Sequence, residues 1–255
     1  MIFRTDLALE RRDIYNKANK LENDVDGIEC EQENINDKIS VTRVKITNEN
    51  GEIAINKPKG EYITLDIKKL KYMEDENINE CANYLSKEIS KLVDMHINKQ
   101  EPILIVGLGN IYVTPDALGP KVAKGIEVTR HVIKYYPQFV KEGTRSISAI
   151  SPGVLGVTGI ETLEIVKGIV DNVKPKLVIA IDSLCSKNID RISSTIQISD
   201  TGIVPGAGVG NTRAELSKNT LGIPVIAIGV PTVVDLRYHY RWRIRYIYRK
   251  ITRKS

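Results

Sequence analysis

The stretch that decides the fold reads Pro102-Ile103-Leu104-Ile105-Val106-Gly107-Leu108-Gly109-Asn110. Residues 103–106 are all apolar, which is typical of a strand buried on both faces of a sheet. The glycines and the asparagine that follow predict a loop at the carboxyl end of that strand. An α/β core therefore begins near residue 100.

Strands and helices alternate beyond this stretch. The pattern predicts a helix over about 120–136, a strand near 146–150 and a helix near 160–172, which Thr158 and Glu161 would start with a capping box. Alternating elements imply an α/β fold, with a mostly parallel sheet and helices on both faces. Further strands are predicted at residues 177–181, 195–198 and 224–228.

The N-terminal third has a different pattern. Residues 5–40 are highly charged and predict helix, whereas residues 41–46 alternate as a strand does. Asn50-Gly51 predicts a turn back into a second strand at 52–55, and residues 61–67 form a third alternating run. We expect a small antiparallel β-meander over residues 40–75, followed by an amphipathic helix over 76–98.

Composition excludes several classes of protein. Apolar residues make up 42% of the 255 and charged residues 27%, as in ordinary globular proteins. There is neither an apolar run of about 20 residues nor a secretory signal at the start, so we expect a cytoplasmic protein with no membrane partner. The three cysteines are far apart, which argues against a disulfide framework or a structural zinc site.

The positive charge is concentrated at one end of the chain. Residues 237–255 hold eight Arg and Lys and no acid. Their charge of +8 exceeds the net charge of +5 of the whole chain, so the preceding residues are mildly acidic. We therefore expect no direct nucleic-acid contact by the main domain.

Two aspartates follow strands of the predicted core. Asp116 lies in the loop after the first strand, and Asp182 follows the strand at 177–181. Because reacting groups gather beyond the carboxyl ends of parallel strands, the two carboxyls could meet there. The alternatives are that Asp116 caps the next helix and that Asp182 is a turn residue.

A close carboxyl pair suits peptide hydrolysis. Two neighbouring carboxyls share one proton, so the ionised one can take a proton from water while the protonated one polarises the scissile carbonyl. A divalent metal between Asp116 and Asp182 could do the same as a Lewis acid. The two alternatives are thus a reaction that requires no cofactor and one assisted by a divalent metal.

Other chemistries have weaker support. Tyr112 stands where a dinucleotide loop needs its third glycine. None of His96, His131 and His239 accompanies a GxSxG elbow, and Cys185, a possible thiol nucleophile, has no obvious histidine partner. Gly107, Gly109 and Asn110, together with the cluster that contains Gly208, Gly210 and Asn211, are candidates for holding substrate backbone, although tight turns are the alternative.

Five motifs in order make the chain resemble the germination protease family over residues 4–235. The resemblance also includes the opening Arg4-Thr5-Asp6-Leu7-Ala8-Leu9-Glu10. The motifs are Gly107-Leu108-Gly109-Asn110 with Thr114-Pro115-Asp116-Ala117-Leu118-Gly119-Pro120, Ser151-Pro152-Gly153-Val154-Leu155-Gly156-Val157-Thr158-Gly159-Ile160-Glu161-Thr162, Ile181-Asp182-Ser183-Leu184, Gly206-Ala207-Gly208-Val209-Gly210-Asn211 and Gly229-Val230-Pro231-Thr232-Val233-Val234-Asp235.

The resemblance implies an endopeptidase that starts the degradation of small acid-soluble spore proteins during germination. It implies a homotetramer of the forespore and spore core, made as a self-processing zymogen. The two essential aspartates of the family fall on Asp116 and Asp182, and the processing site on Asp6 and Leu7. A more distant resemblance to hydrogenase maturation proteases implies a core of that type, and a metallopeptidase of that kind is one alternative function.

The resemblance also implies the domain plan. Residues 1–6 would be a propeptide and 7–235 the peptidase domain, with the meander inserted at 40–75 and the α/β core at 100–235. Residues 236–255 look foreign to the family, which predicts a truncated or frameshifted end. A second alternative is therefore an inactive fragment whose basic tail binds nucleic acid.

Overall fold

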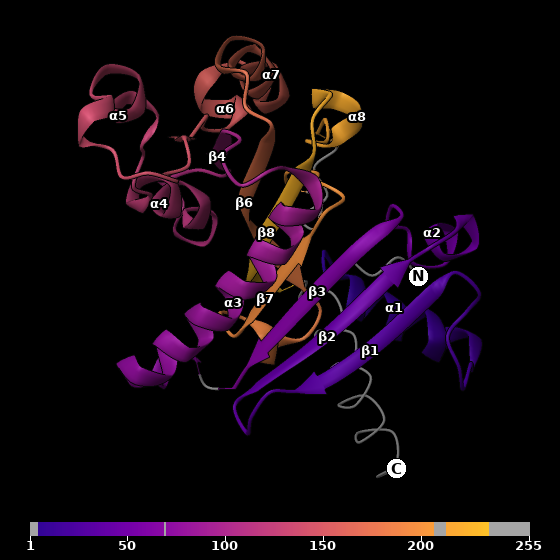
Figure 1. Ribbon diagram of the computed structural model, residues 1–255. Coiled ribbons are helices and arrows are strands. Elements are labelled where there is room, and N and C mark those ends of the chain that lie inside the picture. The colour runs from indigo at the N-terminus through magenta and orange to yellow at the C-terminus, as the bar shows by residue number, and fades with distance from the viewer. Residues whose placement is uncertain (1–4, 69, 207–212, 235–255) are drawn as a thin grey trace, which may run out of the picture.

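The computed structural model describes residues 5–68, 70–206 and 213–234, and it gives no side-chain placement for residues 71, 75 and 76. Residues 235–255, which include the basic tail, lie outside the described residues, as do Gly208, Gly210 and Asn211. Within the described ranges, eight strands form one sheet in the order β1-β2-β3-β7-β8-β6-β4-β5 (Figure 1). Their bounds are β1 Ile28–Asn34, β2 Ile39–Ile46, β3 Gly60–Ile67, β4 Ile103–Gly107, β5 Ile147–Ile150, β6 Leu177–Ser186, β7 Thr195–Ser199 and β8 Val225–Val234.

The sheet is mixed. Strands β8, β6, β4 and β5 pair in parallel, whereas β1, β2, β3, β7 and β8 pair in an antiparallel series. The prediction of a mostly parallel sheet is therefore wrong, although the α/β class is confirmed. The reason lies in the connection over residues 187–194, which is shorter than the dozen or so residues that a parallel crossover needs, so β7 returns antiparallel.

Helices cover both faces of this sheet. Helix α3 (Asp75–His96) packs with α4 (Leu118–Gly125) on one face, where α3 runs diagonally across the strands in Figure 1. On the other face, α7 (Thr162–Val173) and α8 (Lys218–Leu221) cover the parallel half. That face of the antiparallel half carries α1 (Ala8–Asn19) and α2 (Glu49–Ile55).

Alternation within single strands divides the core between the two faces. In β4, Ile103 and Ile105 face the α3 layer, whereas Leu104 and Val106 face α7. Successive side chains of a strand point to opposite faces, so a wholly apolar strand is what a sheet covered on both sides requires. The interpretation of residues 103–106 as a doubly buried strand is confirmed.

The N-terminal third departs from the predicted pattern at two places. Residues 5–40 contain α1 but then form β1, so the prediction of continuous helix is wrong. The predicted strand at 52–55 is instead part of α2, because the side chain of Asn48 accepts a hydrogen bond from the Gly51 amide and starts a helix there. Three antiparallel strands do form, but β1 takes the place of the second half of the predicted hairpin.

The shorter elements refine the remaining predictions. The predicted helix over 120–136 is divided into α4 and α5 (Arg130–Tyr135). Helix α7 begins with a capping box made by Glu161 and Glu164, not by Thr158, which lies in the preceding short helix α6 (Leu155–Thr158). The 3-10 turns are η1 Leu70–Tyr72, η2 Thr114–Asp116, η3 Pro137–Phe139 and η4 Ile189–Arg191.

One glycine fixes the spacing between α4 and the sheet. A Cβ atom on Gly119 would lie 2.2 Å from the Leu108 carbonyl oxygen and 2.4 Å from that of Ile181. Both contacts are with backbone, which cannot move aside as a flexible side chain can. The Leu108 amide also donates to the Ile181 carbonyl at 2.8 Å. Gly119 thus allows the loop after β4 to pack directly on β6.

We expect Gly119→Ala to lower the free energy of unfolding by about 1–3 kcal/mol or more, because the added methyl group overpacks a backbone contact. Gly168→Ala is the matched control: it lies inside α7, and a Cβ there meets nothing within 4 Å. Alanine at that position should stabilise the protein by up to about 1 kcal/mol. Urea unfolding followed by circular dichroism measures both, and equal effects would contradict the close-packing account.

Candidate functional site

Asp116 closes the loop that follows β4. Its Oδ2 accepts a hydrogen bond from the Asn110 amide at 2.8 Å. Gly109 has a φ of +112°, and a Cβ there would lie 2.1 Å from the Asp116 carbonyl oxygen, so only glycine fits. The alternative in which Asp116 caps helix α4 is wrong, because the N-cap is Ala117 and no side chain caps it.

Asp182 lies inside a strand. Strand β6 continues to Ser186, so the prediction that Asp182 marks the strand's end is wrong. The pairing of β6 with β4, however, ends at Gly107 opposite Ile181, which puts Asp182 just past the end of the neighbouring strand. Asp182 is 4% exposed, and its Oδ1 accepts a hydrogen bond from the Ser183 amide at 2.8 Å.

The two aspartates line one cavity. This cavity, here called the aspartate cleft, has a volume of about 330 Å³, and its lining includes Asp6, Asn110, Asp116, Asp182 and Arg213. Strand β4, which leads into the Asp116 loop, and strand β6, which carries Asp182, are neighbours in the sheet.

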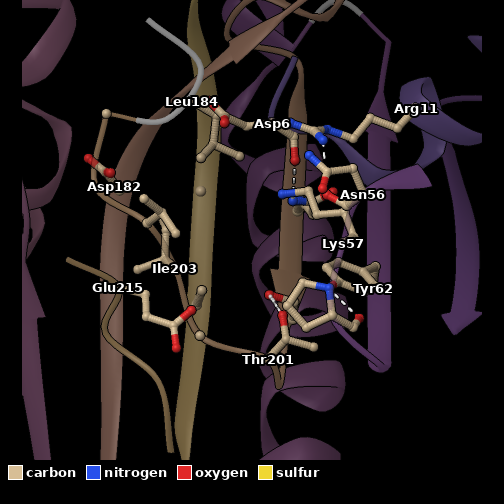
Figure 2. A pocket seen from close by; sticks show the side chains of 18 residues that line it. Asp6, Arg11, Asn56, Lys57, Tyr62, Asp182, Leu184, Thr201, Ile203 and Glu215 are labelled. Carbon is tan, nitrogen blue, oxygen red and sulfur yellow. Dashed lines mark hydrogen bonds between the residues drawn. The ribbon is translucent and has the colours of Figure 1, made fainter. Parts of the chain in front are cut away.

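A second cavity of about 290 Å³ adjoins it. We call it the cationic cleft, because Arg11 and Lys57 line it together with Gln197. Asp6 and Asp182 line both cavities. In the view of Figure 2, Asp6 lies between Asp182 on one side and Arg11 and Lys57 on the other.

The environments of the two carboxyls differ. Burial raises the pKa of Asp182 to about 8, and the negative charges of Asp116 and Asp6 add to the shift. Burial also raises the pKa of Asp116, but the Asn110 amide and the charge of Arg213 act in the opposite direction. Because Asp182 is almost wholly buried and Asp116 only half-buried, Asp182 holds its proton at neutral pH while Asp116 is the better base.

The N-terminal segment is bound along the second half of β6. The Asp6 amide donates to the Cys185 carbonyl at 2.8 Å, and the Cys185 amide donates to Asp6 Oδ2, also at 2.8 Å. Arg11 Nε donates to the Thr5 carbonyl at 2.9 Å. Further along, the Glu10 carboxylate accepts from the amides of Lys187 and Asn188.

This arrangement buries the predicted processing site. Asp6 is 9% exposed and Leu7 is fully buried. Neither Thr5 nor Asp6 caps the first helix, because the N-cap of α1 is Leu7 and no side-chain hydrogen bond caps it.

The other candidate residues are partly brought together. Gly109 and Asn110 line the aspartate cleft, whereas Gly107 ends β4 under the Gly119 carbonyl and lines neither cleft. Cys185 also lines the aspartate cleft, and its Sγ is 3.7 Å from the Ser186 carbonyl oxygen. Among the described residues, no histidine lines either cavity to serve as a base for Cys185, and His239 lies outside those residues.

Sequence reasoning missed Arg11, Lys57, Gln197 and Arg213. No motif marks them, and Arg11 and Lys57 are far from Asp182 along the chain. The one available signal was Gln197, a polar residue between Ile196 and Ile198 in a predicted core strand. Arg213 Nη1 is buried with no hydrogen-bond partner among the described residues, and the guanidinium faces the aspartate cleft.

The donors for a metal ion are few. Among the described residues, no cluster of three or more His, Cys, Asp or Glu side chains could hold one. Catalytic zinc sites use three protein ligands, so Asp116 and Asp182 alone do not supply such a set. In the same part of the chain, none of the helices has the length and apolar character that crossing a membrane would require.

The raised pKa of Asp182 makes stability depend on pH. Between about pH 4 and 8 the folded chain keeps a proton that the unfolded chain has released, so stability falls as pH rises through this window. We expect Asp182→Asn to raise the melting temperature by several degrees at pH 8 and by less at pH 4. Asp171→Asn, at an exposed position, is the control and should change the melting temperature equally at pH 4 and pH 8. An equal change at both pH values for Asp182→Asn would contradict a buried, neutral Asp182.

Comparison with known proteins places the chain in a family. The family model described as germination protease matches residues 6–255, a range that includes the basic tail. The germination protease of Clostridium acetobutylicum is 50% identical over 233 residues, which is 91% of this chain and 70% of that protein. The germination protease of Caldanaerobacter subterraneus subsp. tengcongensis is 48% identical over 252 residues, which is 99% of this chain and 75% of that protein.

A third relative agrees. The germination protease of Clostridium perfringens strain 13 is 46% identical over 232 residues, covering 91% of this chain and 70% of its own length. The similarity thus includes β4, the Asp116 loop and β6, which build the aspartate cleft. This chain belongs to the germination protease family.

Proposed function

We propose that Asp116 and Asp182 perform the peptide hydrolysis of this spore-germination endopeptidase. One observation carries the proposal: two carboxyls of unequal burial line the same cleft, and Asp6, at the predicted processing site, lines it as well. One neutral and one ionised acid in contact with a peptide is the arrangement that general acid–base hydrolysis requires.

The roles follow from the two environments. Ionised Asp116 takes a proton from water, and the water oxygen forms a bond to the carbonyl carbon of the substrate. The electron pair of the C=O bond moves to its oxygen, which accepts a hydrogen bond from protonated Asp182. The carbon–nitrogen bond then breaks, the leaving nitrogen takes the Asp182 proton, and one carboxylic acid and one amine result.

The cationic cleft supports small acid-soluble spore proteins as substrates. The family resemblance implies cleavage after an acidic residue that precedes an apolar and then a small one. Asp6-Leu7-Ala8 has this order. Burial lowers the pKa of Arg11 and lowers the pKa of Lys57 to about 8, whereas the charge of Asp6 favours the cationic form of both side chains. An incoming acidic side chain would meet the same two cations.

The same geometry supports a self-processing zymogen. Residues 1–6 would be a propeptide ahead of a peptidase domain over 7–235, and Asp6 occupies the wall shared by the two clefts. A short leader that ends at this wall would act locally, near the catalytic cleft, without a folded inhibitory domain. Assembly as a homotetramer in the cytoplasm of the forespore and the spore core belongs to the same proposal.

Removing either carboxyl should stop catalysis. We expect Asp116→Asn and Asp182→Asn each to lower the rate of cleavage of a small acid-soluble spore protein by about 10²- to 10⁴-fold, since each loses proton transfer but keeps its shape. Cys185→Ala is the control from the same cleft and should retain most activity. Near-parental turnover in either aspartate variant, with the fold verified by circular dichroism, would show that residue to be dispensable.

The activating cut should fall between Asp6 and Leu7. Incubation at mildly acidic pH should give a chain that begins at Leu7, and the rate should decline as pH rises through about 8, where Asp182 loses its proton. N-terminal sequencing and intact mass over pH 4–9 measure both. A cut at another bond would contradict the proposed processing site, and a rate that keeps rising above pH 8 would contradict the role of protonated Asp182.

A further inference from the structure

Gln197 contacts the backbone on both sides of the Asp6–Leu7 bond. It lies in β7, is 7% exposed, and lines the cationic cleft. Its Nε2 donates to the Asp6 carbonyl oxygen at 3.3 Å, and its Oε1 accepts from the Ala8 amide at 2.8 Å. One carboxamide therefore spans the peptide bond that the proposed self-cut would break.

Only one orientation of this carboxamide is consistent with both contacts. A carbonyl oxygen needs a donor, and an amide N–H needs an acceptor. Turning the group over would place oxygen against oxygen and N–H against N–H in a buried place, where an unmade hydrogen bond costs about 1–3 kcal/mol. The NH₂ group thus points at the carbonyl that hydrolysis would attack.

The contact with Ala8 alone would be structural. Ala8 is the first residue of α1, its amide has no acceptor within the helix, and Leu7 provides no side-chain cap. Any acceptor would satisfy that amide. The second contact has a different character, because the Asp6 carbonyl precedes the helix and its donor, Gln197, lines a cleft together with Asp6 and Asp182.

We propose that Gln197 is a further catalytic residue of the self-cut: its Nε2 stabilises the negative charge that develops on the Asp6 carbonyl oxygen, and its Oε1 holds Ala8 so that the bond stays in place. The inference rests on the proposed cut between Asp6 and Leu7. When water adds to the Asp6 carbon, the C=O electron pair moves to the oxygen and the Nε2–H bond to it strengthens. The carboxamide exchanges no proton and is unchanged at the end.

Two substitutions separate the donor from the acceptor. Gln197→Met removes both contacts at similar length, whereas Gln197→Glu keeps an acceptor for Ala8 and loses the donor whenever it is ionised. Formation of the chain beginning at Leu7 is followed by intact mass from pH 4 to pH 8 in the 255-residue protein. Loss of one donor of this kind lowers rates by about 10²- to 10³-fold.

We expect Gln197→Met to be slowed by about this factor at every pH. Gln197→Glu should be equally slow at pH 8 and should recover toward the parental rate as pH falls, since a protonated carboxyl donates again. A role confined to capping α1 would leave Gln197→Glu at the parental rate throughout.

Thr64→Val is the matched control. Thr64 is fully buried directly opposite Gln197 in the β3–β7 pair, and its Oγ1 has no hydrogen-bond partner among the described residues. The Thr64→Val variant should cut at the rate of the unsubstituted protein. If the unsubstituted protein cuts between Asp6 and Leu7 and both Gln197 variants cut at the same rate, the role of Gln197 is overturned but the processing site is not. A parent that does not cut there would overturn the processing site as well.

Discussion

The paired hydrogen bonds between Asp6 and Cys185 are the contact on which the rest of the site depends. The Asp6 amide and the Asp6 carboxylate both bind the backbone of Cys185 in β6. An acidic residue can therefore be buried there with its polar groups hydrogen-bonded. Glu10 repeats the device one turn later, where it accepts from two amides that follow β6. These two anchors fix the start of α1, and Asp6 lines the same cavities as Asp182.

Asp182 is buried more deeply in the aspartate cleft than Asp116, so the two carboxyls differ in how readily they ionise. A carboxyl that is 4% exposed and close to two other acids is more stable neutral than charged. Asp116 has a route to solvent, a backbone amide and a nearby guanidinium, which favour its ionised form. The asymmetry thus comes from the depth of each residue, because the side chains are chemically identical. The consequence is that the contribution of Asp182 to the free energy of unfolding falls as pH rises toward 8.

The mixed sheet explains how a helix from the N-terminus reaches residues from the core. The short connection after β6 forces β7 to run antiparallel, so β7 pairs with β3 on one side and β8 on the other. This joins the three N-terminal strands to the parallel half in one sheet. It also turns Gln197 toward α1, so that a core strand contributes to the binding of the first residues of the chain.

The sequence by itself determined the α/β class, the doubly buried strand β4, helix α3 and the two aspartates as a pair. These depend on local periodicity and on loop chemistry after a strand, which a few neighbouring residues encode. Only the tertiary structure decided the direction of β7, the helix at 49–55 and the place of Asp182 inside β6. It alone also brought Arg11, Lys57 and Gln197 to Asp6. Strand direction depends on which distant strand offers a free edge, and burial sets the protonation of Asp182, so neither can be determined from neighbours along the chain.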